Sequence, residues 1–188
     1  ETQTAGRGRL GRPWHGEVGH ALTFSLGLML KPVDWSGLSL AVGLSLARSL
    51  DPQGELGVRL KWPNDLCWQS AGMLRKLGGI LIETQMGAAS AESPARRWCV
   101  VGVGVNLRTP HIHSPGLAPV GWGEVTGEAA PQGPDLLQAC MAALVPAFQR
   151  GLDLEGQRAL AAAELDARAG SGGLGRHGAS AADIGHLD

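Results

Sequence analysis

The 188-residue chain lacks several features that would place a protein in a broad class at once. Its three cysteines, Cys67, Cys99 and Cys140, are odd in number and have no CxxC spacing, so we expect free thiols in a cytoplasmic protein. The formal net charge is −1, which gives no overall attraction to nucleic acid or membrane. No apolar run reaches the roughly 18 residues of a membrane span, and no signal segment opens the chain. Any specific function must therefore lie in local motifs.

Alternation of apolar and polar or small residues is the main pattern that is present. It predicts strands at 21–30, 58–62, 66–69, 76–84 and 98–107. Helical periodicity or composition predicts helices at 35–50, 135–149 and 157–169, the first capped by Asp34 or Ser36. The remaining stretches are expected to be a hairpin connection at 85–97 and a mostly irregular segment at 108–133. Because strands outnumber helices and connections are short, we predict an α+β fold: a mixed, largely antiparallel sheet with helices on one face.

The first functional motif is an arginine- and glycine-rich stretch near the N-terminus, followed by Trp14. It contains Gly6, Arg7, Gly8, Arg9, Gly11 and Arg12. Glycine lets backbone N–H groups turn toward an anion, and the guanidinium fork matches phosphate or carboxylate oxygens. A solvated charge run is the alternative, but such a run does not need repeated glycines. We therefore expect an anion-binding loop that is mobile when empty.

The second motif is the stretch Lys61–Asp65, with the sequence KWPND. Lys61 faces away from the apolar side of its strand, to which we assign Trp62. Pro63 ends the strand and directs Asn64 and Asp65 outward. An ordinary polar turn is the alternative for these two residues taken alone.

Lys76 begins the next predicted strand and is followed by Gly78 and Gly79, which remove side chains where a ligand could lie against the backbone. A solvated strand-end lysine is the alternative. The strand at 98–107 also has a face with few side chains. Its odd positions are apolar, while Gly102, Gly104 and Asn106 share the other face. That face would make a floor for a flat ligand.

Two common nucleotide motifs do not fit. The glycines at 102 and 104 are not a dinucleotide fingerprint, since Leu107 stands at the third glycine position, and the chain has no GxxxxGK[ST] sequence. His111 and His113 have no cysteine or carboxylate partner at ligand spacing, so we interpret them as exposed loop histidines and expect no protein metal site.

These motifs, in this order, resemble those of the biotin protein ligases, over about residues 1–151. The resemblance implies the class II synthetase-like catalytic fold of the biotin/lipoate ligases. It also implies ATP-dependent ligation of biotin to a specific lysine of a biotin carboxyl carrier protein through biotinyl-5′-AMP. In that reaction Lys76 would bridge the biotin carboxylate and the α-phosphate, the arginine loop would close over the adenylate, and Asp65 would orient or deprotonate the acceptor amine.

The resemblance assigns a role to each matching residue. The catalytic residues are Arg9, Lys61, Lys76 and Asp65. The biotin-binding residues are Gln3, Gly6, Arg7, Arg9, Lys76, Gly79 and Gly102. The nucleotide-binding residues are Arg9, Arg12, Trp14, Lys61, Asn64, Lys76 and Asn106.

The expected substrates are biotin and ATP, with Mg²⁺ carried mainly by the phosphate oxygens. The expected partner is the carrier protein, a homodimer is compatible with the pattern, and neither a DNA-binding domain nor a membrane is implied. Two alternatives stay open: a lipoate or octanoate ligase or acyltransferase of the same fold, and a noncatalytic fragment that only binds ligand.

The chain departs from the family pattern at both ends. It starts at Glu1, after the family's strand and helix with a Ser/Thr-Asn stretch, and the family's C-terminal β-barrel is not recognisable after Arg158. We therefore expect a catalytic domain at 1–169 without its N-terminal segment, and a poorly ordered tail at 170–188. The missing strand would leave an unpaired sheet edge that favours self-association.

Overall fold

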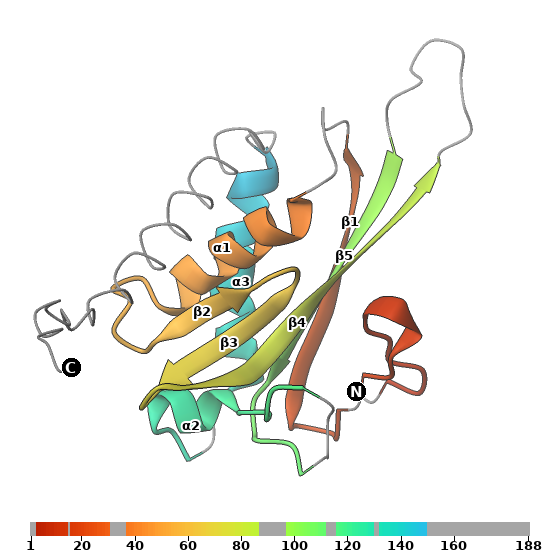
Figure 1. Ribbon diagram of the computed structural model, residues 1–188. Helices are drawn as coiled ribbons and strands as arrows, with labels where there is room; N and C mark the ends of the chain where they lie inside the picture. The colour runs from red at the N-terminus through yellow and green to blue at the C-terminus, as the bar shows by residue number, and fades with distance from the viewer. Residues whose placement is uncertain are drawn as a thin grey trace, which may run out of the picture.

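The computed structural model describes residues 3–14, 16–30, 37–86, 97–111, 116–129 and 132–149. In chain order its elements are the 3-10 turn η1 (Arg9–Gly11), β1 (Ala21–Leu30), α1 (Leu38–Leu50), β2 (Val58–Lys61), β3 (Asp65–Ser70), β4 (Met73–Met86), β5 (Arg97–Asn106), α2 (Trp122–Thr126) and α3 (Gly133–Gln149). The strands form one sheet in the order β1-β5-β4-β3-β2, and every neighbouring pair is antiparallel. Helices α1 and α3 pack against each other on one face of it (Figure 1). The predicted α+β fold is confirmed.

Strand β5, which lies between β1 and β4, has two different faces. Its odd positions Cys99, Val101, Val103 and Val105 are at most 3% exposed and belong to the core that α1 and α3 complete. Its even positions lie on the opposite, open face, where the neighbouring strands also carry small side chains. In cross-strand register Gly104 lies between Thr23 and Gly79, and Gly102 lies between Ser25 and Leu81. The predicted face assignment of this strand is confirmed.

Three local predictions are wrong. Strand β2 ends at Lys61, and Trp62 is 72% exposed in the following turn instead of joining the apolar side, because Pro63 cannot continue the ladder. Strand β4 begins at Met73, so Lys76 lies inside a strand and not at its start. A two-residue turn with positive φ at Ala71 and Gly72 allows this earlier start, since it joins β3 directly to β4.

The third correction concerns the start of a helix. The N-cap of α1 is Gly37, and not Asp34 or Ser36. Helix α2 is a short addition of five residues to the segment 108–133, which was predicted to be mostly irregular. The predicted helix at 157–169, the tail at 170–188 and most of the connection at 85–97 lie outside the described residues. Among the helices that are described, none is long and apolar enough to cross a membrane.

Asp51 links the helical layer to the strand that leads into the KWPND motif. Its side chain is buried at the end of α1, and its carboxylate accepts hydrogen bonds from the backbone N–H groups of Leu56, Gly57 and Val58 at 3.0 to 3.2 Å. These N–H groups belong to a tight loop and to the first residue of β2, so no helix or strand partner could satisfy all of them. The carboxylate therefore fixes where β2 begins.

We predict that Asp51→Ala lowers the free energy of unfolding by about 3 kcal/mol, because it leaves one buried and two partly buried N–H groups without acceptors. Urea denaturation followed by circular dichroism measures this. Glu55→Ala is the matched control, since Glu55 is exposed in the same loop and should change the stability little. Equal effects of the two substitutions on the free energy of unfolding would contradict the structural role of the Asp51 carboxylate.

Candidate active site

Residues 6–14 fold into a small hairpin beside the open face of the sheet. The Trp14 N–H donates to the Gly6 carbonyl at 2.9 Å, the Gly8 N–H donates to the Arg12 carbonyl at 2.7 Å, and η1 forms the tip. The glycines have different uses here. Gly11 has a φ of +70°, whereas a Cβ on Gly6 would lie only 2.4 Å from the Trp14 carbonyl oxygen. Of the three glycines predicted to supply permissive φ, only Gly11 does so, and Leu10 takes the other left-handed position at the tip.

Trp14 crosses from this hairpin onto the glycine face. A Cβ built on Gly104 would lie 2.7 Å from an indole carbon of Trp14, so the ring rests directly on that glycine. The floor predicted for a ligand is thus covered by Trp14 at Gly104. At Gly102 the nearest atom would be 3.5 Å away, and the face stays open there.

The KWPND turn faces the tip of the hairpin. Asn64 is fixed to β4 twice, through its side-chain amide to the Ile80 carbonyl at 2.8 Å and through its own carbonyl to the Ile80 N–H at 3.0 Å. Its remaining side-chain oxygen accepts a 3.4 Å hydrogen bond from the Arg9 guanidinium. Arg9 and Asn64, 55 residues apart in the chain, therefore meet at one edge of the site.

Lys76 and Asp65 form an ion pair at the centre of the site, with 2.7 Å between Lys76 Nζ and Asp65 Oδ1. The two side chains are 32% and 21% exposed, so the pair is partly withdrawn from water. Both groups lie beside Gly79, whose missing side chain leaves them room. Gly78 differs, since a Cβ there would lie 2.4 Å from the Gly104 carbonyl oxygen. Gly78 serves close strand pairing, and the prediction that it faces a ligand is wrong.

Cys67 lies in β3, opposite Lys76 in the cross-strand register, and is fully buried. Burial, and then the negative charge of Asp65, raise the pKa of its thiol to about 11, against the opposing effect of Lys61 and Lys76. At neutral pH the group is a thiol and not a thiolate, so it is a poor nucleophile.

Asn106 ends β5 with a buried side chain whose amide group donates to the carbonyls of Val120 at 3.2 Å and Lys76 at 3.4 Å. The amide nitrogen is therefore used in holding the backbone of Lys76, and the side-chain oxygen is the group left for a ligand.

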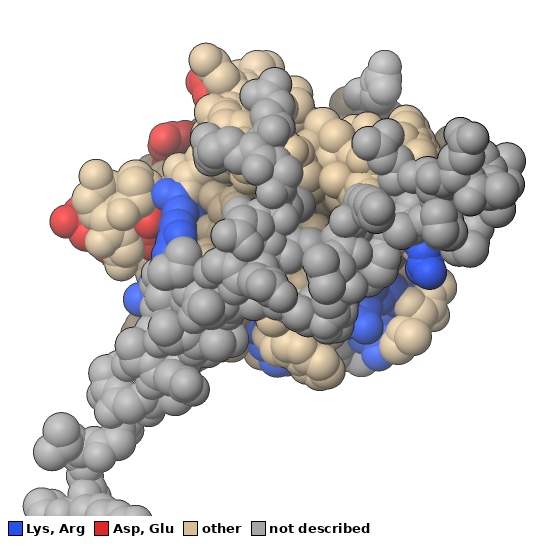
Figure 2. Space-filling model, turned by 90° about the horizontal axis from the view of Figure 1, so that it is seen from above, with Lys and Arg blue, Asp and Glu red and all other residues tan. Residues whose placement is uncertain are grey.

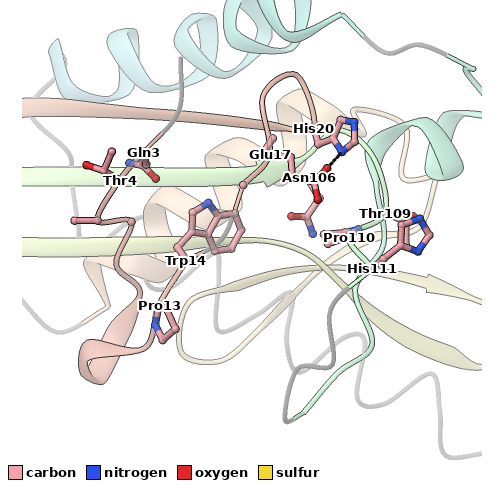
Figure 3. Close-up of a pocket in the computed structure, with 14 residues that line it drawn as sticks. Gln3, Thr4, Pro13, Trp14, Glu17, His20, Asn106, Thr109, Pro110 and His111 are labelled. Carbon is pink, nitrogen blue, oxygen red and sulfur yellow. Dashed lines mark ion pairs between the residues drawn. The ribbon is translucent and has the colours of Figure 1, made fainter.

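A cavity of about 1100 Å³ joins these groups. The predicted site residues that line it are Gln3, Arg7, Arg9, Arg12, Trp14, Lys61, Asn64, Asp65, Lys76, Gly79, Gly102 and Asn106. Gly6 instead lines an adjoining cavity of about 550 Å³, which shares Trp14 and Asn106 with the larger one and extends to His20 and His111 (Figure 3). Lysine and arginine side chains appear as several separate groups in the view of Figure 2. The larger cavity has five cationic side chains against Asp65 and Glu83, so it suits a polyanionic ligand.

Sequence reasoning missed several residues of these cavities. Thr23 and Ser25 of β1 line the larger one, as do Glu83 and the segment 116–119 in part. The small polar residues of β1 could have been found, since they alternate with the apolar residues that were recognised. The segment 116–119 had no periodic pattern to reveal it. No group of three or more His, Cys, Asp or Glu side chains suited to a metal ion occurs in the described part of the chain.

Comparison with known proteins agrees with this geometry. The chain is 40% identical to the bifunctional ligase/repressor BirA of Escherichia coli over 109 residues, which are 57% of this chain and 31% of that protein. It is 37% identical to the biotin--[acetyl-CoA-carboxylase] ligase of Mycobacterium tuberculosis over 115 residues, 57% of this chain and 37% of that protein. The chain thus spans about a third of the length of these relatives.

A solved biotin protein ligase from Aquifex aeolicus, in complex with biotin and ATP, superimposes with a TM-score of 0.55 at 26% identity, over 79% of this chain and 58% of that one. The Leishmania major enzyme with biotinyl-5-AMP has a TM-score of 0.56 at 21% identity, over 82% and 69% of the two chains, and supports the fold. A family model for the biotin/lipoate A/B protein ligase family matches residues 1–106. Since that match covers more than half of the sequence, the chain belongs to the biotin/lipoate A/B protein ligase family.

Proposed function

We propose that this chain carries the catalytic site of a biotin protein ligase, which joins biotin to a carrier-protein lysine through biotinyl-5′-AMP. The observation that carries the proposal is the convergence of Lys76, the arginine hairpin and the glycine face on one cavity of about 1100 Å³. Its size suits a ligand made of two joined parts, and its charge suits a carboxylate lying next to a triphosphate.

In the first half-reaction a biotin carboxylate oxygen attacks the α-phosphorus of ATP, and pyrophosphate leaves. The Lys76 ammonium offsets the repulsion between carboxylate and phosphate and stabilises the charge that develops between them. Arg9, Arg12 and Lys61 hold the remaining phosphate oxygens. The substrate oxygens replace Asp65 as acceptors for the Lys76 N–H groups, because both sets of oxygens compete for the same ammonium.

In the second half-reaction a lysine amine of the carrier attacks the mixed anhydride, AMP leaves, and the amine nitrogen loses a proton. In this proposal Asp65, released from Lys76, orients that amine and accepts the proton. No covalent intermediate with the protein is needed. The raised thiol pKa of Cys67, the cysteine nearest to Lys76, agrees with this, since the side chain is protonated at neutral pH.

The reaction also needs a metal-bound nucleotide and an acceptor protein. ATP enters as its Mg²⁺ complex, with the ion bound mainly by phosphate oxygens. A biotin carboxyl carrier protein is the acceptor, and the cytoplasm is the location. A homodimer is supported by β1, which is an edge of the sheet among the described strands and carries the 49% exposed Met29.

Biotin-dependent exchange of pyrophosphate into ATP tests the proposal directly. We expect exchange with biotin and none with lipoate or octanoate at the same concentration. Exchange that depends on lipoate would reassign the substrate within the family. Binding of biotin, measured by calorimetry, without any exchange would show a noncatalytic binding protein.

We predict that Lys76→Ala lowers the rate of biotin-dependent exchange by about 10² to 10³-fold, because one preorganised cationic donor is lost at the reacting centre. The melting temperature should change little, since the ion pair with Asp65 is only partly buried. Lys76→Arg keeps the charge but not the position of the donor and should recover only part of the rate. A full rate in Lys76→Ala would remove Lys76 from the mechanism.

Arg9→Gly should loosen retention of the adenylate more than it weakens binding of biotin or ATP. Its guanidinium contacts Asn64 across the cavity, so its loss separates the hairpin tip from the KWPND turn. The expected result is release of biotinyl-AMP into solution and labelling of nearby lysines on unrelated proteins. Arg108→Ala, an exposed arginine that lines neither cavity, is the control and should retain the adenylate.

Gly104→Val should displace Trp14 from the sheet, because the new side chain occupies the position of the indole ring. We expect a red shift in tryptophan emission and at least a tenfold loss of adenylate affinity, with little change in the urea midpoint, since the other face of β5 keeps its packing. Unchanged emission and affinity would show that Trp14 does not depend on this glycine.

A further inference from the structure

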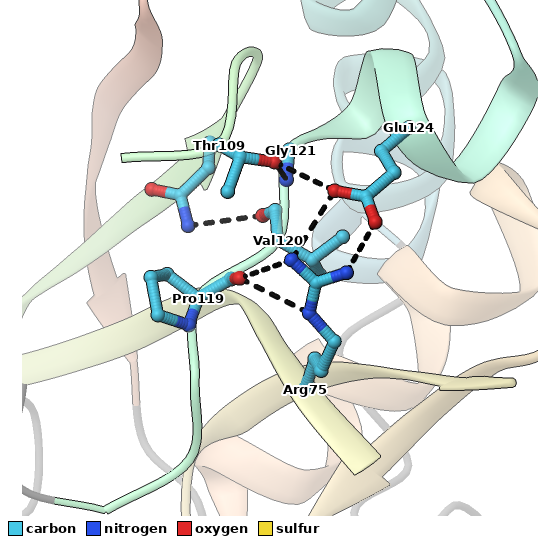
Figure 4. Close-up of polar contacts among 7 residues, drawn as sticks. Arg75, Thr109, Pro119, Val120, Gly121 and Glu124 are labelled. Atoms are coloured by element: carbon cyan, nitrogen blue, oxygen red, sulfur yellow. Dashed lines mark hydrogen bonds and ion pairs between the residues drawn. The ribbon is translucent and has the colours of Figure 1, made fainter. Parts of the chain in front are cut away.

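Arg75 precedes the proposed catalytic lysine and has no part in the chemistry proposed above, yet its guanidinium makes four hydrogen bonds. Its guanidinium donates to the Pro119 carbonyl from Nε at 3.2 Å and from Nη2 at 2.7 Å. It also forms an ion pair with both carboxylate oxygens of Glu124, as Figure 4 shows. The planar fork of arginine suits this double use, and a lysine could not reproduce it.

Glu124 is itself fixed from the other side. Its carboxylate accepts a hydrogen bond from the Thr109 hydroxyl at 2.9 Å, and the same hydroxyl accepts one from the Gly121 N–H at 2.9 Å. The hydrogen bond from Arg75 is the main cause that lowers the pKa of Glu124, so the carboxylate is charged at neutral pH. We call Arg75, Glu124, Thr109 and the Pro119 carbonyl the Arg75 network.

The segment held by this network is the one that pairs with the backbone of Lys76. The Lys76 N–H donates to the Ala118 carbonyl at 2.8 Å, and the Val120 N–H donates to the Lys76 carbonyl at 2.9 Å. Asn106 joins the same place, since its amide donates to the Val120 and Lys76 carbonyls. Residues 118–120 therefore contact the Arg75 side chain through the Pro119 carbonyl. The same segment contacts Lys76 and Asn106, two of the proposed site residues.

We propose that Arg75 and Glu124 are positioning residues that hold the backbone of Lys76, and through it the Lys76 ammonium, in the geometry for adenylate formation; this rests on the function proposed above. Neighbouring residues of a strand point to opposite faces, so a fixed Arg75 side chain on one face limits the rotation of Lys76 on the other. Arg75 also lies over the Trp68 ring, 5.9 Å from its centroid, which ties the same point to β3. Small errors in the position of a charged donor have large effects on rate, which is why a supporting network is needed.

Amide hydrogen exchange tests the structural half of the proposal without any ligand. In Arg75→Met we expect the N–H groups of Lys76 and Val120 to exchange at least tenfold faster, while those in the β1–β5 ladder are unchanged. Arg59→Met is the matched control, because Arg59 also donates to a backbone carbonyl but lies on β2, outside the Arg75 network. If Arg75→Met does not fold, Glu124→Gln removes the ionic partner at constant shape. The same faster exchange of the Lys76 and Val120 N–H groups is then expected in that variant. Unchanged exchange at both amides would overturn the proposal.

A double-mutant cycle tests whether Arg75 acts through Lys76. The measured quantity is the dissociation constant of a nonhydrolysable biotinyl-adenylate analogue for the parent, Arg75→Met, Lys76→Ala and the double variant. We expect Arg75→Met to weaken binding about tenfold in the parent and less than about threefold when Lys76 is already absent. Equal losses in both backgrounds would show that Arg75 acts independently of Lys76, and would overturn the positioning role. Failure of the parent to bind the analogue would refute the proposed function instead. The hydrogen-exchange result would then show by itself whether the Arg75 network holds the backbone of Lys76.

Discussion

The site depends on one constraint, the strict alternation of side chains along β5. One face of this strand must bury Cys99, Val101, Val103 and Val105 beneath the helices, and the other face has no side chain at Gly102 and Gly104. The charged groups of the cavity therefore come from other segments. Arg7, Arg9 and Arg12 come from the hairpin at residues 6–14, Lys61 and Asp65 flank the KWPND turn, and Lys76 and Glu83 come from the neighbouring strand β4. This is why residues as distant in sequence as Arg9, Lys61 and Asn106 line one cavity.

Charge is handled differently at the centre and at the rim of the cavity. The arginines of the hairpin lie near water, where an unpaired cation costs little. Lys76 is more enclosed and has Asp65 as its counterion at 2.7 Å. Such a pair is easily exchanged for another anion, because it is only partly buried and its net contribution to stability is small. The protein thus keeps a cation in a sheltered position without binding it so firmly that a substrate oxygen could not take over.

The sequence predicted the layers and many of the residues that line the larger cavity, because both depend on short-range patterns. The alternation at 98–107 was enough to place Gly102 and Gly104 on the open face, and the KWPND and Lys76 motifs were recognised by their order in the chain. What failed depends on contacts between distant segments. Nothing local shows that Gly78 avoids the Gly104 carbonyl, or that Trp14 rests on Gly104. The role of residues 118–120 beside Lys76 likewise follows from a pairing across more than 40 positions. Trp62 is a different case, because the neighbouring Pro63 ends β2 one residue earlier than the alternation indicated.

The burial of the three cysteines has a practical consequence for studying the hairpin. Cys67, Cys99 and Cys140 are each fully enclosed, and burial raises the pKa of every one of these thiols. Because its pKa is raised to about 11, the Cys67 side chain is a thiol and not the reactive thiolate at neutral pH. Reagents that alkylate thiols therefore have no ready target in the natural sequence. A single cysteine introduced at Leu10, which is 87% exposed at the tip of the hairpin, would be the one site to take up a spin label or fluorophore, without prior removal of any native cysteine.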